Sequence, residues 1–251
     1  MRIARAMALA GIDSRRKCEQ YVTMGEVCLN GQVIHDLGRQ VDIDNDEITF
    51  RGRPLSFERY VYYVLHKPKG YTTTARDEHA KKTVFDLLPH KLTARTKNPQ
   101  SRTRVFTVGR LDKDSTGLLL FTNDGELANR LTHPRYGVGK WYEVRLDRTF
   151  DDRDGLKLRK GVQLEDGMAK AEKLHSISKR VLRILICEGK NREVRRLFEK
   201  VGYEVVELCR VAFGPLLLGA MPPGQGRFLN SSEVRRLKEA VPEPAKKSTA
   251  V

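Results

Sequence analysis

The sequence from residue 108 to residue 125 constrains the fold most, because two apolar runs flank a short polar turn. The turn contains Asp112, Asp114 and Ser115, and it closes at Gly117, where the second apolar run begins. This pattern predicts a strand, a loop and a second strand, with Asp112 where the first strand gives way to the loop. Side chains in such loops commonly face a cleft. Asp112 and Asp114 could also serve only the turn, because aspartates often bond their own backbone.

Composition indicates a globular protein with a polyanionic partner. Apolar residues make up 39% of the 251 positions, which suffices for a packed core. Lys and Arg total 47 against 32 Asp and Glu, so the formal net charge is +15. Residues 61–110 hold 11 basic and 3 acidic side chains, and the excess is therefore centred just before Asp112. Nucleic acid is the first candidate for the partner.

Several other classes of protein are not supported. The chain lacks the run of about 18 apolar residues that a membrane span needs, and its first residues are too short in apolar length for a signal peptide. We therefore expect a cytoplasmic protein without a membrane partner. The 4 cysteines are far apart and the 6 histidines are scattered, so neither a disulfide framework nor a metal site is expected.

Residues 1–52 predict a small domain of two helices and a β-hairpin. Gly11 separates two helical patterns, Asp13 or Ser14 can cap the second one, and alternating strands follow it. The segments Ala10–Lys17 and Met24–Gly31 resemble the RNA-binding module of ribosomal protein S4 type. The resemblance implies that Arg15, Arg16 and Lys17 meet RNA phosphates. The start of a helix suits this role, because its free N–H groups and positive dipole end attract anions.

The remaining chain predicts a linker at 53–60, a larger domain at 61–241 and a disordered tail at 242–251. A strand at 61–65 is followed by a turn at Pro68 and Gly70, which we expect to display Lys67 on the surface for RNA. Residues 90–104 form a basic loop without acidic side chains, expected to be mobile alone and to grip RNA.

The pattern of the larger domain indicates an α+β fold with a mainly antiparallel sheet, because its strands outnumber its helices and short turns join them. The sequence predicts helices at 126–131, 151–160, before Gly202 and from a Ser231 cap to Ala240, and strands at 140–146, within 169–187, at 203–211 and at 215–218.

Three motifs occur in order along the larger domain: Gly109–Leu119, Lys140–Tyr142 and Glu188–Arg196. Together with the S4-type module, they are similar to the motifs of the bacterial rRNA pseudouridine synthases. The segment Leu127–Arg135 and the form of the third motif resemble the branch that acts on large-subunit rRNA. The resemblance implies isomerisation of uridine to pseudouridine in rRNA, without a cofactor or a metal.

The resemblance also implies roles for individual residues. Asp112 aligns with the essential aspartate, which either attacks the anomeric carbon or removes a sugar proton; the sequence leaves both routes open. Arg195 aligns with the cation that pairs with this aspartate, and Tyr142 aligns with the tyrosine that stacks on the target base. Arg110 would fill the gap left when the uridine leaves its stack.

Arg192 and Arg196 are expected to contact RNA phosphates beside the site. Two alternatives remain for the function: a target in small-subunit rRNA, or a non-catalytic RNA-binding or ribosome-assembly protein. The combination of Asp112, Tyr142 and Arg195 favours the enzyme, because a pure RNA binder has no use for a carboxylate in an anion-binding cleft. A monomer is expected.

Overall fold

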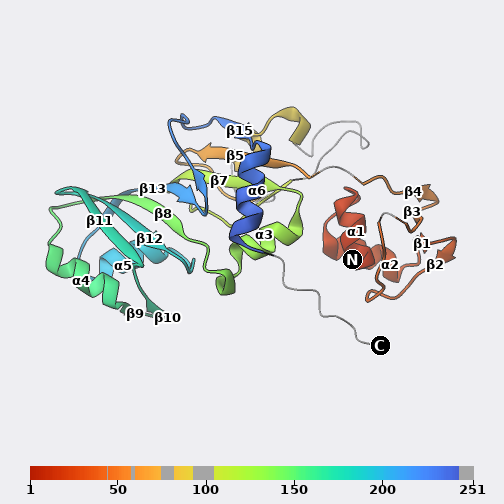
Figure 1. Cartoon of the computed structure of the whole chain (residues 1–251), viewed down its shortest axis with the longest axis horizontal. Coiled ribbons are helices and arrows are strands. Elements are labelled where there is room, and N and C mark those ends of the chain that lie inside the picture. The colour runs from red at the N-terminus through yellow and green to blue at the C-terminus, as the bar shows by residue number, and fades with distance from the viewer. Residues whose placement is uncertain (44, 58–59, 75–81, 93–104, 243–251) are drawn as a thin grey trace. The chain divides into compact units, whose positions relative to one another are not determined.

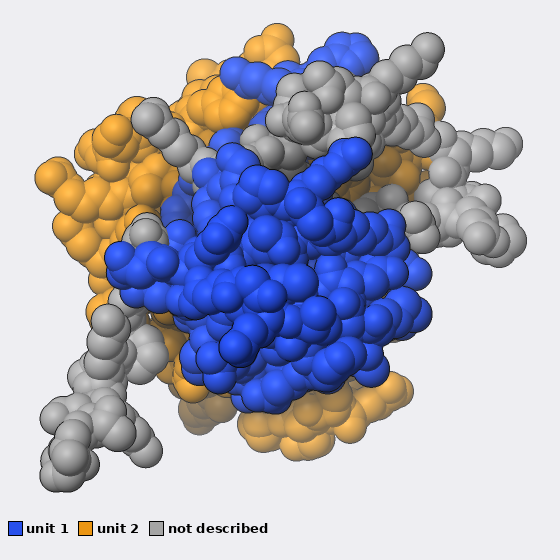
Figure 2. All heavy atoms as spheres, turned by 90° about the vertical axis from the view of Figure 1, so that its right-hand side faces the viewer, with its two compact units in different colours: residues 1–61, 89–105 blue, residues 62–88, 106–251 orange. Residues whose placement is uncertain are grey.

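The computed structural model describes residues 1–43, 45–57, 60–74, 82–92 and 105–242. The chain divides into two compact units, one of residues 1–61 with 89–105 and one of residues 62–88 with 106–251 (Figure 2). Most of the basic loop expected at 90–104 lies outside the described residues, and so does the expected tail apart from residue 242.

The first unit contains two helices and a four-stranded antiparallel sheet of order β2-β1-β3-β4. Its elements are α1 (Ile3–Leu9), α2 (Arg15–Thr23), β1 (Val27–Leu29), β2 (Gln32–Val33), β3 (Ile48–Phe50), β4 (Arg53–Pro54) and the 3-10 helix η2 (His90–Leu92). Ser14 caps α2 by accepting a hydrogen bond from the Lys17 backbone at 3.4 Å. The first two residues of the expected linker belong to the sheet, as β4.

The second unit is built on a nine-stranded sheet with the order β11-β12-β8-β13-β7-β5-β15, to which β14 and β6 add at β13 and β7. Its strands are β5 (Tyr62–Lys67), β6 (Phe106–Thr107), β7 (Thr116–Thr122), β8 (Lys140–Leu146), β11 (Lys173–Ser178), β12 (Val181–Ile186), β13 (Val205–Phe213), β14 (Leu216–Leu217) and β15 (Gly226–Phe228). A separate hairpin joins β9 (Val162–Leu164) and β10 (Gly167–Ala169).

Helices cover two parts of this sheet and form two apolar cores (Figure 1). The helical elements of the second unit are η1 (Val84–Leu87), α3 (Gly125–Thr132), η4 (Pro134–Tyr136), α4 (Asp152–Lys160), α5 (Glu193–Lys200) and α6 (Ser231–Ala240). One core joins α4 and α5 to β8, β11 and β12, and the other joins α3 and α6 to β5 and β7. Among the residues that the structure describes, all strand pairs of this sheet are antiparallel except β13 with β7, so the predicted α+β fold is confirmed. No described helix is both long and apolar enough to span a bilayer.

Side-chain caps explain where α3 and α6 begin. Asp124 caps α3 by accepting a hydrogen bond from the Leu127 backbone at 3.0 Å, and Tyr62 Oη donates to the same carboxylate at 2.8 Å. The expected cap at Ser231 is wrong by one residue. Asn230 caps α6 instead, because its side chain accepts from the Glu233 backbone while the Glu233 carboxylate accepts from the Asn230 backbone.

One row of paired residues runs across four strands and positions the cleft of this unit. Lys67 on β5 pairs with Gly117 on β7, Gly117 pairs with Arg210 on β13, and Arg210 pairs with Tyr142 on β8. Position 117 in this row must be a glycine. Its φ is +110°, and a Cβ atom there would lie 2.3 Å from the carbonyl oxygen of Arg210 and 2.4 Å from its nitrogen.

The structure corrects the expectation that Lys67 is displayed to RNA, because its side chain is fully buried. Its ammonium group donates to the carbonyl oxygens of Pro68 at 3.1 Å, Lys113 at 3.3 Å and Ser115 at 2.7 Å. Lys67 therefore holds the backbone of the loop between β6 and β7 in place. Burial lowers the pKa of Lys67 to about 8, although the nearby carboxylates of Asp114 and Asp112 act in the opposite direction.

Substitution of Gly117 by alanine is expected to destabilise the second unit by roughly 2–4 kcal/mol, because it adds both a backbone clash and an unfavourable φ. Chemical denaturation followed by circular dichroism measures this loss. The matched control is Gly137→Ala, since Gly137 also has a positive φ of +57° but has open space around its Cβ position. This control should lose only about 1–2 kcal/mol. Equal losses in the two variants would contradict the close approach of β7 and β13.

Lys67→Met tests the buried ammonium through pH dependence. In the unfolded chain the pKa of Lys67 returns from about 8 to the ordinary 10.5, so between these values the unfolded state binds more protons than the folded state. The free energy of unfolding of the wild type should therefore rise relative to that of Lys67→Met as the pH increases through this interval. Denaturant unfolding of both proteins between pH 7 and about 10.5 measures the difference. A difference that stays constant with pH would show that Lys67 is not buried as a charged group.

Candidate active site

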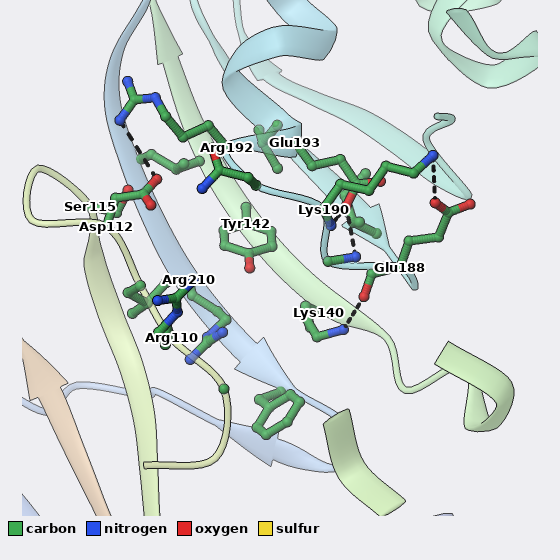
Figure 3. A pocket seen from close by; sticks show the side chains of 18 of the residues that line it. Arg110, Asp112, Ser115, Lys140, Tyr142, Glu188, Lys190, Arg192, Glu193 and Arg210 are labelled. Carbon is green, nitrogen blue, oxygen red and sulfur yellow. Dashed lines mark hydrogen bonds and ion pairs between the residues drawn. The ribbon is translucent and has the colours of Figure 1, made fainter. Parts of the chain in front are cut away.

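The second unit contains a cavity of about 300 Å³ at the end of the loop between β6 and β7 (Figure 3). The rest of its wall comes from β8, from the loop that precedes α5 with the first turn of that helix, and from β13, together with Thr132 at the end of α3 and Ile186 at the end of β12. The residues used below that line it are Arg110, Asp112, Lys140, Tyr142, Arg192, Glu193 and Arg210. Three of the sequence motifs thus meet at one cavity.

Asp112 lies in the loop between β6 and β7, as predicted, but five residues beyond the end of β6 and not at the end of the strand. The backbone N–H of Ser115 donates to the Asp112 carbonyl oxygen at 3.1 Å, and the hydroxyl of Thr73 donates to the Leu111 carbonyl oxygen at 2.7 Å. Leu111 is buried, which fixes the loop between its exposed neighbour Arg110 and Asp112. The Asp112 side chain is 33% exposed and lines the cavity, so the carboxylate is held in place but accessible.

The arginines of α5 differ from their expected arrangement. The Arg195 guanidinium pairs with Asp114 at 3.0 Å, and not with Asp112 as the resemblance implies. The reason is that Arg195 also donates to the Val205 carbonyl oxygen at 2.7 Å, which fixes its side chain on the side of Asp114. Arg192 is the cation nearest to Asp112 among the described residues, with 3.8 Å between Nη1 and Oδ2. Arg192, expected at RNA phosphates, therefore lies in the cavity wall.

Arg196 does not have the free guanidinium that a phosphate contact needs. Its two terminal nitrogens donate to the two carboxylate oxygens of Asp166 at 2.9 and 2.8 Å. This bidentate pair holds Arg196 against the turn between β9 and β10, outside the cavity wall. The expected phosphate contact of Arg196 is therefore not supported by its position.

Tyr142 lies in the middle of β8, where it pairs with Ile184 on β12 and Arg210 on β13. Its side chain packs partly against the core below α5 and also lines the cavity. In the view of Figure 3, Tyr142 lies between Asp112 and Lys140. A half-buried aromatic ring in this position provides a surface for a planar base, and the predicted stacking role remains a prediction.

Two buried cations of the cavity wall were not predicted as site residues. The Lys140 ammonium donates to the carbonyl oxygens of Val138, Cys187 and Glu188, and burial, together with the charge of Arg210, lowers the pKa of Lys140. The Nε of Arg210 donates to the Leu118 carbonyl oxygen at 2.8 Å, while its Nη2 is buried without a partner among the described residues. The sequence signal for Arg210 was its place inside an apolar strand, where a charged residue needs a specific reason.

Glu193 shapes the loop before α5. Its carboxylate accepts hydrogen bonds from the backbone N–H groups of Gly189 at 2.8 Å and Lys190 at 3.0 Å, and burial raises the pKa of Glu193. The next residue back, Arg192, has a left-handed backbone with φ +47° and is the N-cap of α5. This unusual turn directs Arg192 to the cavity and could not be read from the helical spacing of the arginines.

The RNA-binding residues expected in the first unit are on its surface. Arg15, Arg16 and Lys17 form the exposed first turn of α2, and Arg15 pairs with Glu19 at 3.2 Å one turn later. The described residues contain no group of three or more His, Cys, Asp or Glu side chains that could hold a metal ion.

Comparisons with known proteins agree with this arrangement. Residues 61–200 match the family model for RNA pseudouridylate synthase, and residues 1–48 match the model for the S4 domain. One relative is the ribosomal large subunit pseudouridine synthase B of Bacillus subtilis (strain 168), which is 39% identical over 244 residues, 94% of this chain and 95% of the relative.

A second relative is an uncharacterized RNA pseudouridine synthase of Aquifex aeolicus (strain VF5), which is 37% identical over 246 residues, 96% of this chain and 95% of the relative. A solved crystal structure of a pseudouridylate synthase is 27% identical with a TM-score of 0.66, and the match covers 94% of this chain and 99% of that one. The match of the family model, the whole-chain relatives and the similar solved fold agree. The chain therefore belongs to the RNA pseudouridine synthase family and carries an N-terminal S4 domain.

Proposed function

We propose that this pseudouridine synthase modifies a specific uridine of large-subunit rRNA, with Asp112 as the essential carboxylate. The observation that carries the proposal is the position of Asp112, which is held at the wall of a cavity with Arg192 3.8 Å away and Tyr142 in the same wall. The large-subunit target is supported by the name of the Bacillus subtilis relative, at 39% identity over most of both chains. The exposed cations at the start of α2 supply a second site for rRNA phosphates.

The proposed reaction is an isomerisation, so its atoms balance within the uridine. The bond between N1 of uracil and C1′ of the sugar breaks with its electron pair on uracil, and C5 then bonds to C1′. The proton on C5 leaves, and N1 gains a proton. A fixed carboxylate assists the first step in one of two ways. It attacks C1′ to form an ester, which breaks when C5 bonds to C1′, or it removes the proton from C2′ to give a glycal and returns that proton to C2′ when C5 bonds to C1′. Both routes need the ionised form, which aspartate side chains ordinarily have at neutral pH.

The other residues of the cavity wall support this chemistry by position and charge. A uridine must leave its stack to reach Asp112, and the ring of Tyr142 can then support the base. Arg110 is exposed at the rim and can occupy the place of the extruded base. The positive charge of Arg192 favours the uracil anion that forms when the glycosidic bond breaks.

Mapping of pseudouridines in rRNA from cells that lack the protein tests the target. Loss of one modification in large-subunit rRNA would agree with the proposal, and loss of one in small-subunit rRNA would redirect it to that subunit. An unchanged map, together with rRNA binding by the purified protein, would favour a non-catalytic role in ribosome assembly.

Asp112→Asn is expected to lower the rate of pseudouridine formation by at least ~100-fold, because the neutral amide can neither attack the sugar nor accept its proton. The affinity for RNA should stay within a few fold, since the shape of the loop is kept. Release of tritium from C5 of labelled uridine measures the rate, and filter binding measures the affinity. Asp166→Asn serves as the control, since Asp166 does not line the cavity. A rate near that of the wild type in Asp112→Asn would exclude the catalytic role.

Replacement of both Arg15 and Arg16 by glutamine should weaken RNA binding and reduce the slope of log Kd against log salt by about 1–2, because fewer counterions are released from the RNA. The rate at saturating RNA should change little. Arg51→Gln provides a control in the same unit, since Arg51 lies outside α2 and two of its guanidinium nitrogens donate to the Glu26 carboxylate at 2.9 and 3.0 Å. Equal salt slopes for the wild type and the double variant would show that the start of α2 does not contact RNA phosphates.

A further inference from the structure

Two aspartates and two arginines form a charged cluster at the edge of the cavity. Asp112 and Asp114 come from the loop between β6 and β7, while Arg192 and Arg195 come from the start of α5. The arginines do not divide evenly between the carboxylates. Arg195 lies 3.0 Å from Asp114, and Arg192 lies 3.4 Å from Asp114 but 3.8 Å from Asp112. Asp114 is therefore the principal partner of both guanidinium groups.

Asp114 is held more firmly than its 39% exposure suggests. Its partner Arg195 is only 13% exposed and is fixed at its other terminal nitrogen by the Val205 carbonyl oxygen. The backbone on both sides of Asp114 is fixed as well, because Lys67 donates to the carbonyl oxygens of Lys113 and Ser115. Arg195 of α5 and the ammonium group of Lys67 thus together fix the position of Asp114.

The carboxylate of Asp112 has different surroundings from that of Asp114. Among the described residues, Arg192 is the only arginine within ion-pair distance of Asp112. Their separation of 3.8 Å is too long for a hydrogen bond. A carboxylate that accepted strong hydrogen bonds from a guanidinium would be a poorer nucleophile and a poorer base, because those bonds stabilise its charge. A positive charge held slightly further away still favours negative charge that develops on the substrate.

We propose that Asp114 is a positioning residue that binds Arg195 and Arg192 and thereby leaves the carboxylate oxygens of Asp112 free for the sugar. The proposal rests on the proposed function of Asp112. Without the charge of Asp114, the nearest carboxylate for Arg192 becomes Asp112, and Arg195 loses its partner. Asp114 acts through the arginines and does not line the cavity itself.

Single-turnover rates and RNA affinities of Asp114→Asn and Asp114→Glu test this role. Asp114→Asn should lower the rate at saturating RNA by roughly ten- to a hundredfold, the effect of losing a charged hydrogen bond, with Kd for RNA within about twofold. Asp114→Glu restores the charge and should recover a large part of the rate. Asp166→Asn is the matched control, because it removes the carboxylate of another arginine pair on α5 away from the cavity. It should keep the wild-type rate.

The double variant Asp114→Asn with Arg195→Gln separates positioning from general destabilisation. If Asp114 acts through Arg195, the double variant should be no slower than the slower of the two single variants. Multiplied losses, a wild-type rate in Asp114→Asn, or a rate loss matched by unfolding at the assay temperature would each overturn the proposal.

Asp112→Asn in the same assay distinguishes the two proposals. An inactive Asp112→Asn with a fully active Asp114→Asn contradicts only the positioning role. An active Asp112→Asn contradicts the proposed function, and the positioning role fails with it.

Discussion

The close parallel pairing of β7 and β13 is the constraint on which the cavity depends. It is the one parallel pair in the described part of this sheet, and Gly117 allows it because no side chain could fit against the backbone of Arg210. β7 follows the loop of Asp112, and β13 follows α5 in the chain. The pairing therefore brings the aspartate loop and the arginines of α5 to one place, although more than 75 residues separate them in sequence.

Backbone carbonyl groups, and not carboxylates, accept the hydrogen bonds that the buried cations around this pairing donate. Lys67 and Lys140 each donate to three carbonyl oxygens, and Arg210 donates to the carbonyl oxygen of Leu118 on β7. Lys67 and Lys140 thus each join separate loop segments, and Arg210 joins β13 to β7. Because these hydrogen-bond partners are neutral, the positive charges of Lys140 and Arg210 remain in the cavity wall and attract a polyanion.

Local sequence signals predicted much of the fold but only part of the site. The cap at Ser14, the strand at 140–146 and the position of Asp112 between two strands depend on neighbouring residues, and the structure confirms them. The burial of Lys67 depends on the register of β5 and β7. The predicted turn at Pro68 therefore did not reveal that Lys67 is buried. The partner of Arg195 depends on its hydrogen bond to the Val205 carbonyl oxygen, which the spacing of the arginines does not reveal.

The distribution of charge also distinguishes an enzyme from a protein that only holds RNA. A carboxylate in a wall lined by Lys140, Arg192 and Arg210 repels phosphate and weakens a binding surface. A guanidinium that neutralised Asp112 directly would reduce this repulsion of phosphate, yet the guanidinium of Arg195 is bound to Asp114. An arrangement that keeps one carboxylate accessible among fixed cations has little value for binding. It has clear value where that carboxylate must react with a sugar.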